Sequence, residues 1–300
     1  MRRLAAITLI PLALAGCGGG DDATTTASEA GFNADRAFAD LAAQVDFGPR
    51  PSGSPAAHET AEFIADSMRE AGLDAVTIQS PWENVVGTIP GDLPGTVVVG
   101  AHYDTKNVPR GFLGANDGAS GVAVLLELAR SLPARLSGPS VQLVAFDAEE
   151  ARDDRDFDVD GTRGSRQYME YARAGGQQGS VPVTQIKAMV LFDLIGDCDL
   201  QIPYEANSDK DLYALFAVTR AELNNGNADP FRFNTFPVGD DHVPFKQAGI
   251  PAVDFIDFTF GPGAPPGLYW HTRKDTLDKV CPSSLEAVGE TALRAIPKIR

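Results

Sequence analysis

The sequence predicts an α/β fold: a single domain in which a mixed, mostly parallel central sheet is flanked by helices on both faces. Three observations favour this class. Apolar runs of strand length alternate with segments of helical spacing along the chain. Polar side chains suited to metal binding stand at or beside the ends of several of these runs. A chain of 300 residues with 43% hydrophobic side chains can also bury one substantial core.

The elements follow one another in an alternating order. Ser54 and Pro55 open one helix in the manner of an N-cap followed by a first-turn proline. The runs rich in β-branched residues have the length of strands, and the longer segments with apolar residues every three or four positions have the spacing of helices. We expect helices at 33–46, 55–71, 118–132, 164–174, 209–224 and from 283 onward, and strands at 74–79, 84–89, 96–101, 139–147, 186–195 and 250–257.

The first residues have the composition of an export signal. Arg2 and Arg3 precede an apolar stretch, residues 4–15, that is too short to span a bilayer as a mature helix. The stretch ends in Leu-Ala-Gly-Cys, which resembles the bacterial lipobox, and Cys17 would then carry the lipid; an ordinary cleaved signal with a chance cysteine is the alternative. We therefore expect a lipoprotein signal peptide at 1–16, a flexible tether at 17–31 and a catalytic domain at 32–300, anchored through Cys17 to the bacterial cell envelope on its periplasmic or extracellular face.

The net charge and the cysteines limit which molecules and metal ions the protein can bind. A net charge of −16 argues against nucleic acid, whose phosphates would be repelled. Part of the acidity lies in residues 151–160, which we expect to form a solvated loop. Cys198 and Cys281 can form one disulfide in an oxidising compartment, although the sequence leaves open whether they meet. Neither has the CxxC or CxxH spacing of a zinc ligand.

Two polar clusters flank the first buried runs. TVVVGAHYD brings His102 and Asp104 to one side of an extended segment, so the imidazole can bind a metal while the carboxylate orients it. Taken alone, such a pair belongs more often to a surface loop than to a metal site. Asp117 lies in GANDGASG at the mouth of the 118–132 helix. It can bridge two cations, or it can simply cap the helix, as Ser120 also can.

Two further clusters are harder to explain by folding. Glu149 and Glu150 close the run VQLVAFDAEE and point in different directions, so one can bind a metal while the other faces the substrate as a base. Two carboxylates this close repel each other unless a cation neutralises one of them. Asp193 lies inside the apolar run MVLFDLIG, where an ionised acid is costly without a partner. A buried aspartate that serves only the fold is the alternative.

The last clusters lie near the C-terminal end. His271 directly follows Trp270 after the Gly/Pro-rich loop GPGAPPG, which seldom forms a core, although packing is the usual role of a histidine beside an aromatic ring. VGDDHVPF contributes Asp240, Asp241 and His242. Ligand crevices of open α/β sheets lie at the carboxyl ends of the strands, where distant residues converge. Together the clusters predict a zinc site at that edge.

In this order the motifs GAHYDTK, GANDGASG, LVAFDAEE, FDLIG, DDHVPF and YWHT resemble one family. It comprises the zinc aminopeptidases of the bacterial leucyl aminopeptidase type and their relatives, the glutaminyl-peptide cyclotransferases. The resemblance runs from about His102 to Asp278. FDLIG, the paired acids of DDHVPF, the Trp before His271 and GSRQY after the loop that follows FDAEEA are more similar to the cyclotransferase branch.

The resemblance implies a role for each residue of the site. Asp117, Glu150 and His271 are expected to hold a catalytic zinc ion, Glu149 to act as general acid and base, Asp193 and Asp240 to form a hydrogen-bonded acidic pair, and Trp270 to wall the substrate pocket. The implied reaction converts the N-terminal Gln of peptides or proteins to pyroglutamate with release of ammonia. One zinc ion suffices for it, because the substrate's own amine is the nucleophile.

Two other classes stay open. A di-zinc aminopeptidase would share Asp117 between two ions, with His102 and Asp193 completing the second site. A metal-free binding ectodomain of the same fold would need none of these ligands. The sequence also departs from the animal cyclotransferases: Arg155 stands where they carry a tryptophan, and Ala101 and Val122 stand where they carry a cysteine pair.

Overall fold

The structure is a computed structural model and describes residues 31–73, 75–223 and 229–300. The expected signal peptide, Cys17 and all of the tether except Gly31 lie outside these residues. Among the helices of the described ranges, none is both long and apolar enough to cross a bilayer. The described ranges include the whole of the expected catalytic domain apart from Asp74 and residues 224–228.

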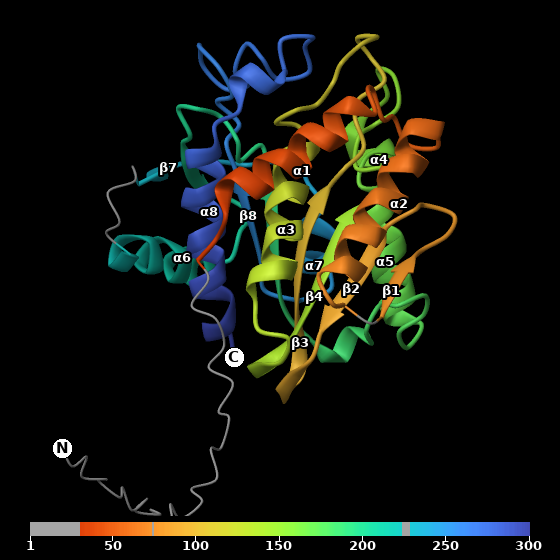
Figure 1. Cartoon of the computed structure of the whole chain (residues 1–300), viewed down its shortest axis with the longest axis vertical. Helices are drawn as coiled ribbons and strands as arrows, with labels where there is room; N and C mark the ends of the chain where they lie inside the picture. The colour runs from red at the N-terminus through yellow and green to blue at the C-terminus, as the bar shows by residue number, and fades with distance from the viewer. Residues whose placement is uncertain (1–30, 74, 224–228) are drawn as a thin grey trace, which may run out of the picture.

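A six-stranded mixed sheet forms the centre of the fold (Figure 1). β3, β4, β5 and β8 are parallel to one another, whereas β1 and β2 run antiparallel along one edge. The predicted α/β class is therefore confirmed. The spatial order is β1 (Val76–Ile78), β2 (Val85–Ile89), β4 (Leu136–Phe146), β3 (Gly91–His102), β5 (Ile186–Asp193) and β8 (Ala252–Ile256).

Helices cover both faces of this sheet because its parallel strands are apolar on both sides. Side chains of β3 alternate: Val97 and Val99 join one buried cluster, and Val98 joins the other. In both clusters, helices pack against the strands and cover the apolar side chains. α1 (Ala34–Asp46), α2 (Pro55–Glu70), α3 (Ala119–Ser131), α6 (Lys210–Leu223) and α8 (Pro282–Ala295) pack on the first face, and α5 (Arg163–Arg173) and α7 (Val243–Gln247) on the second.

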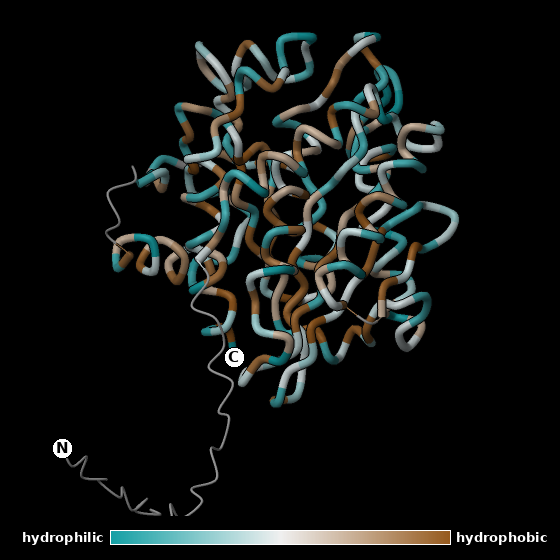
Figure 2. Tube along the Cα trace, viewed as in Figure 1, coloured by the Kyte–Doolittle hydropathy of each residue, from teal (hydrophilic) through white to brown (hydrophobic). Residues whose placement is uncertain are grey.

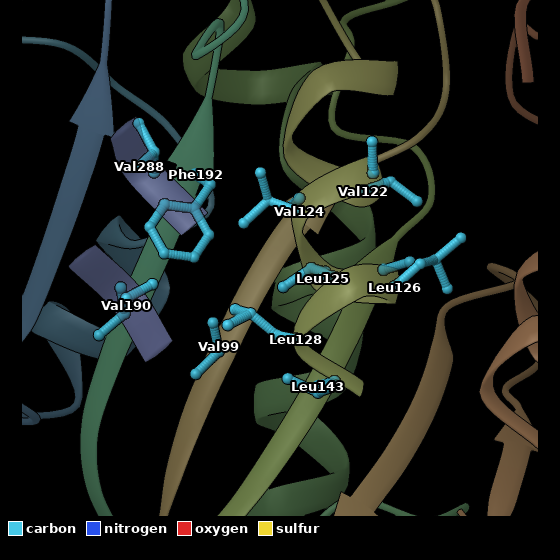
Figure 3. Packing of buried hydrophobic residues seen from close by; sticks show 14 of the residues in the cluster. Val99, Val122, Val124, Leu125, Leu126, Leu128, Leu143, Val190, Phe192 and Val288 are labelled. Carbon is cyan, nitrogen blue, oxygen red and sulfur yellow. The ribbon is translucent and has the colours of Figure 1, made fainter. Parts of the chain in front are cut away.

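The larger core lies between α3 and the central strands. Figure 3 shows Leu125 and Leu128 of α3 close to Val99 of β3, and all three side chains are fully buried. Burial of each such side chain contributes about 1.5–3 kcal/mol relative to exposure. Figure 2 shows the same concentration of hydrophobic residues in the central elements, with hydrophilic residues gathered in peripheral loops. This packing holds the strand ends in a rigid frame.

Helix starts agree with the sequence. Ser54 caps α2 by accepting a hydrogen bond from the amide of Ala57, and Pro55 is the first helical residue. Asn33 caps α1 in the same way through the amide of Arg36. All the predicted helices and strands occur in the structure within a few residues of their predicted bounds.

Several short elements were not predicted. β6 (Ile202–Glu205) and β7 (Phe231–Phe236) pair in parallel as a separate two-stranded sheet. α4 (Phe157–Asp160) interrupts the acidic segment that we expected to be a loop. The short α7 and three 3-10 turns, Val183–Gln185, Leu277–Lys279 and Ile296–Lys298, complete the chain. None of these elements is long enough to show a clear period in the sequence.

A disulfide joins Cys198 and Cys281, which settles the pairing that the sequence left open. Backbone hydrogen bonds run beside it: the amide of Cys281 donates to Gly196, and that of Cys198 to Lys279. The disulfide thus ties the loop after β5 to the start of α8. These two segments follow Asp193 and His271 respectively.

Candidate active site

The parallel strands deliver the predicted residues to one edge of the sheet. His102 is the last residue of β3 and Asp193 the last of β5. Glu149 and Glu150 follow the end of β4, and Asp117 lies in the loop before α3. His271 comes from the segment between β8 and α8, with a left-handed backbone at φ 50°. A non-glycine residue in this conformation is strained, which is common at functional sites.

Two groups of metal-binding atoms meet there and share one carboxylate. In the first, the Nε2 atom of His271 lies 3.0 Å from Glu150 Oε1 and 3.5 Å from Asp117 Oδ2. In the second, the Nε2 atom of His102 lies 3.3 Å from Asp117 Oδ1 and 3.2 Å from Asp193 Oδ1. Within each group the ligand atoms lie within 4.8 Å of one another. Asp117 therefore presents one oxygen to each group.

The first group has the chemistry of a zinc site. Asp117 Oδ2 and Glu150 Oε1 are buried and accept no well-aligned hydrogen bond from the described residues. Buried carboxylate oxygens normally have partners, so these two oxygens, both aimed at the same imidazole, fit a shared cation. Two carboxylates with one histidine also match the three protein ligands of a catalytic zinc site.

Helix capping does not explain Asp117. Gly118 is the N-cap residue of α3, and no side chain caps that helix end. Ser120 instead donates its hydroxyl to the carbonyl of Asn116. The carboxylate of Asp117 is thus left for the two metal-binding groups, and the capping alternative is wrong for this residue.

Asp104 places the paired glutamates. Its Oδ1 accepts the amide of Glu149 at 3.0 Å and its Oδ2 the amide of Glu150 at 3.3 Å. The same Oδ1 lies 3.5 Å from His102 Nδ1, as the predicted orienting carboxylate would. One buried carboxylate therefore fixes the backbone of both glutamates and lies beside the histidine ring.

The pKa values of the two glutamates are shifted in opposite directions. Burial raises the pKa of Glu149 well above its usual range, and the neighbouring carboxylates of Glu150 and Asp240 add to the rise. Burial is the largest single influence on Glu150 and raises its pKa, but the charge and hydrogen bond of His271, with the charges of Lys106 and His102, together outweigh it and leave the pKa below its usual range. Glu150 is therefore the better metal ligand, and Glu149 the better proton carrier.

Asp193 and Asp240 lie in the same acidic environment. Asp193 contacts His102, while Asp240 Oδ1 accepts the amide of Asp241 at 2.5 Å. Burial raises the pKa of Asp240 well above its usual range, and the charge of Asp193 raises it further. This proximity is consistent with the predicted acidic pair, although no direct bond between the two carboxyls occurs in the hydrogen-bond network of the described residues.

A cavity of about 500 Å³ opens over the first metal-binding group. Trp270 forms part of its wall, stacked on His271 with ring centroids 3.7 Å apart and edge-on to Phe258 at 5.1 Å. Ile256 and Val238 extend the apolar wall, and Glu149 faces the same cavity. The lining also includes Asp153, Asp154, Arg155 and Phe157, so this further part of the wall is mostly charged.

The model of peptidase family M28 matches residues 84–296 of this chain, which include every residue of the site. The chain belongs to peptidase family M28. A glutaminyl-peptide cyclotransferase of Bothrops jararaca is 30% identical over 273 residues, which cover 77% of this chain and 73% of the relative. The crystal structure of a glutaminyl cyclase from an Acidobacteriales bacterium is also 30% identical, with a TM-score of 0.78 over 95% of this chain and 99% of the other. A Zn-dependent exopeptidase from Parabacteroides distasonis is 25% identical, with a TM-score of 0.74 over 89% and 98% of the two chains.

Two further residues support the site of this M28 enzyme and were not predicted. Asp275 accepts the amides of Asn116 and Asp117 at 2.7 and 3.0 Å, which fixes the loop that carries the shared carboxylate. Arg50 is fully buried beneath the same loop and donates to five backbone carbonyls, among them those of Leu113 and Gly114. No local pattern marks either residue, because the partners that tie them to the site, Asn116 and Asp117 for Asp275 and Leu113 and Gly114 for Arg50, are backbone atoms distant in sequence.

Proposed function

We propose that this M28 enzyme is a zinc-dependent glutaminyl-peptide cyclotransferase that converts the N-terminal Gln of peptides or proteins to pyroglutamate. One observation carries the proposal: Glu149, a carboxylate of raised pKa, faces the same cavity as the group formed by Asp117, Glu150 and His271. A proton carrier beside a three-ligand metal site is what the cyclisation requires. The names of the cyclotransferase relatives point the same way.

The reaction joins two atoms of one substrate residue. The α-amine nitrogen attacks the side-chain amide carbon, a new carbon–nitrogen bond closes the ring, and the bond to the amide nitrogen breaks to release ammonia. Zinc held by Asp117, Glu150 and His271 would supply a Lewis acid for the amide carbonyl. Glu149 would accept the proton of the attacking amine and return it to the leaving nitrogen.

Other residues of the chain would orient the substrate. Trp270 and Phe258 give the cavity an apolar wall that fits the methylene groups of a glutamine side chain and excludes water. Asp193 and Asp240 lie beside the base and would hold the departing nitrogen through hydrogen bonds. An excess of negative charge at the site also attracts the charged N-terminus of a peptide.

A di-zinc aminopeptidase is the second candidate, and one observation favours it. The group formed by His102, Asp117 and Asp193 offers a second set of ligand atoms beside the first. Two metal ions sharing Asp117 would suit the activation of water for peptide hydrolysis. The number of zinc ions per chain, measured by elemental analysis, bears directly on this alternative.

Mass spectrometry of a Gln-initiated peptide incubated with the purified domain distinguishes the two candidates. A cyclotransferase removes the mass of one ammonia from the peptide and leaves its length unchanged. An aminopeptidase releases the first residue as a free amino acid, and it does so from an Ala-initiated peptide as well. Release of free residues without any cyclised product would overturn the proposed function in favour of the peptidase.

We further infer that the enzyme is exported and lipid-anchored through Cys17. The basic residues and the lipobox-like sequence of the first 17 residues support this, since acylation of that cysteine would leave the domain tethered to a membrane. The disulfide between Cys198 and Cys281 is in keeping with an oxidising compartment.

A further inference from the structure

The backbone that carries Glu149 and Glu150 is held by partners outside the strand. The carbonyls of Ala148 and Glu149 accept the amides of Arg163 and Thr162 at 2.9 and 2.7 Å. The guanidinium of Arg163 donates to the carbonyl of Glu150 at 3.1 Å. Together with the two amides bound by Asp104, these contacts fix the glutamates from both sides.

The next segment, Arg152 to Phe157, is held differently, and it supplies Asp153, Asp154, Arg155 and Phe157 to a mostly charged part of the cavity wall. We call it the wall segment. Its middle is held by two hydrogen bonds between Asn107 and Asp153, each 2.8 Å long. Its start is held by one buried carboxylate, Asp160, which is 7% exposed. Asp160 Oδ2 accepts the amide of Arg152 at 2.8 Å, and its two oxygens accept Nε and Nη2 of the same residue at 3.1 and 2.5 Å.

Two more guanidinium groups converge on the same carboxylate. Arg155, which lines the cavity, reaches Asp160 Oδ1 at 3.4 Å, and Arg163 reaches Oδ2 at 2.8 Å. The Arg163 side chain is only 10% exposed and lies over the ring of Trp82 at 5.0 Å. Asp160 therefore links the wall segment, through Arg163, to the backbone of Glu150. The hydrogen bonds from Arg152, with the charge of Arg163, hold the pKa of Asp160 well below its usual range, so it stays ionised at neutral pH.

We propose that Asp160 is a positioning residue that sets the charged wall of the substrate cavity. Its three arginine partners neutralise it and leave it no contact with the metal ligands' side chains, so it acts on the substrate through the wall segment. The amides of Glu149 and Glu150, and the carbonyl of Glu149, are held without it. Loss of the Asp160 charge should then loosen the wall while the catalytic glutamates stay in place.

The variant Asp160→Asn tests this, and its kinetic arm rests on the proposed cyclisation. Asparagine keeps the size of the side chain but loses the charge that draws in three arginines. We expect KM for a Gln-initiated peptide to rise about tenfold while kcat changes less than about threefold, the result of losing substrate binding rather than catalysis. Bound zinc, measured by elemental analysis, should be unchanged.

A second measurement is independent of the reaction. Amide hydrogen exchange in Asp160→Asn should become faster in the wall segment, where the Arg152 amide loses a charged acceptor, while the amides of Glu149 and Glu150 stay protected. Faster exchange there with no detectable cyclisation by the wild-type enzyme would leave Asp160 in its role and reject only the proposed function.

Glu127→Gln is the matched control. Glu127 is also a buried carboxylate that binds two arginines, Arg36 at 2.6 Å and Arg130 at 3.5 Å, but it lies on α3 away from the cavity. This variant should lose stability without a change in KM. If Asp160→Asn changes KM no more than Glu127→Gln does, or if exchange in the wall segment is unaltered, the positioning role is rejected.

Discussion

Glu149 and Glu150 are adjacent, yet their surroundings assign them different chemistry. Glu150 faces His271 at 3.0 Å and is stabilised as a carboxylate, whereas Glu149 is buried among other acids and binds its proton more tightly. Adjacent residues at a strand end point in different directions, so a shift of one position decides which acid joins the group of Asp117 and His271. The amides of Glu149 and Glu150 donate hydrogen bonds to the carboxylate of Asp104, and these bonds keep the two residues in this arrangement.

Replacing Glu149 with Gln should abolish proton transfer while leaving the metal site intact. We expect kcat for cyclisation to fall by about 10²- to 10⁴-fold, the usual contribution of a positioned acid or base. Zinc content should match that of the wild type, since Glu149 is not in the ligand group that contains His271. Glu150→Gln is the paired control and should lose zinc. An active Glu149→Gln enzyme would remove Glu149 from the mechanism.

Asp257 makes a separate contribution to stability. It follows β8 and is almost fully buried; burial raises its pKa to about 7, against the opposing hydrogen bonds from the amides of Gln201 and Thr259. The unfolded carboxyl titrates near about 3.9, so between these values the folded state holds more protons than the unfolded state. Stability from this group is therefore lost as the pH rises from about 4 to about 7, by at most about 4 kcal/mol.

Asp257→Asn should remove that part of the pH dependence, because asparagine has no proton to lose. Urea denaturation at a series of pH values would show a free energy of unfolding that falls less steeply with rising pH in the variant than in the wild type. Parallel curves for the two proteins would mean that Asp257 does not titrate in this window.

At the scale of elements, the site depends on how closely α3 approaches the sheet. A Cβ atom on Gly121 would lie 2.2 Å from the carbonyl oxygen of Phe192 in β5 and 2.7 Å from Cβ of Ala101 in β3. Only glycine lets the first turn of α3 sit this close to both strands. That contact sets the position of Asp117, just before the helix, relative to Asp193 at the end of β5.

Gly121→Ala should therefore be destabilising, although alanine favours helix formation by about 1 kcal/mol over glycine. We expect a net loss of about 1–3 kcal/mol from overpacking, together with weaker zinc binding. Chemical denaturation and zinc titration would measure both. Gly31→Ala is the control, because its added carbon would meet its nearest neighbour at 3.4 Å, an ordinary contact distance. A Gly121→Ala protein as stable as the wild type would show that α3 can shift without cost.

At the scale of the whole molecule, a sheet packed on both faces leaves its carboxyl edge as the place where polar groups meet. The two hydrophobic clusters on its faces shield the strands from solvent. The strand ends and loops at that edge supply the acids and imidazoles. The disulfide between Cys198 and Cys281 ties two of these loops together from outside the site. The first 30 residues, in turn, are expected to decide where the whole molecule resides.

Cys17→Ser should release the enzyme from the membrane, because a serine cannot carry the thioether-linked lipid. We expect the wild-type protein to partition with the membrane fraction and the variant to remain with the soluble fraction, as followed by immunoblotting. Gly18→Ser keeps the cysteine and should stay anchored. Membrane association of the Cys17→Ser variant would contradict the lipid anchor.

Patterns in the sequence predicted the main helices and strands, and they picked out most of the residues that the structure brings together at the site. Runs of apolar residues mark the buried strands. An acid inside such a run or at its end, as at Asp193 or Glu150, is costly to bury and so indicates a candidate functional residue. Order along the chain then predicted which edge these residues share. Such signals depend on residues that are close together along the chain, so they can be recognised in a single sequence.

Contacts between residues that carry no local signal became apparent only in the folded chain. Asp275 under Asp117, the three arginines around Asp160 and the pairing of β6 with β7 all join segments distant in sequence. Each partner alone resembles an ordinary surface acid, arginine or short apolar run. Their roles arise from burial and proximity, which the packing of the whole chain creates and no single segment encodes.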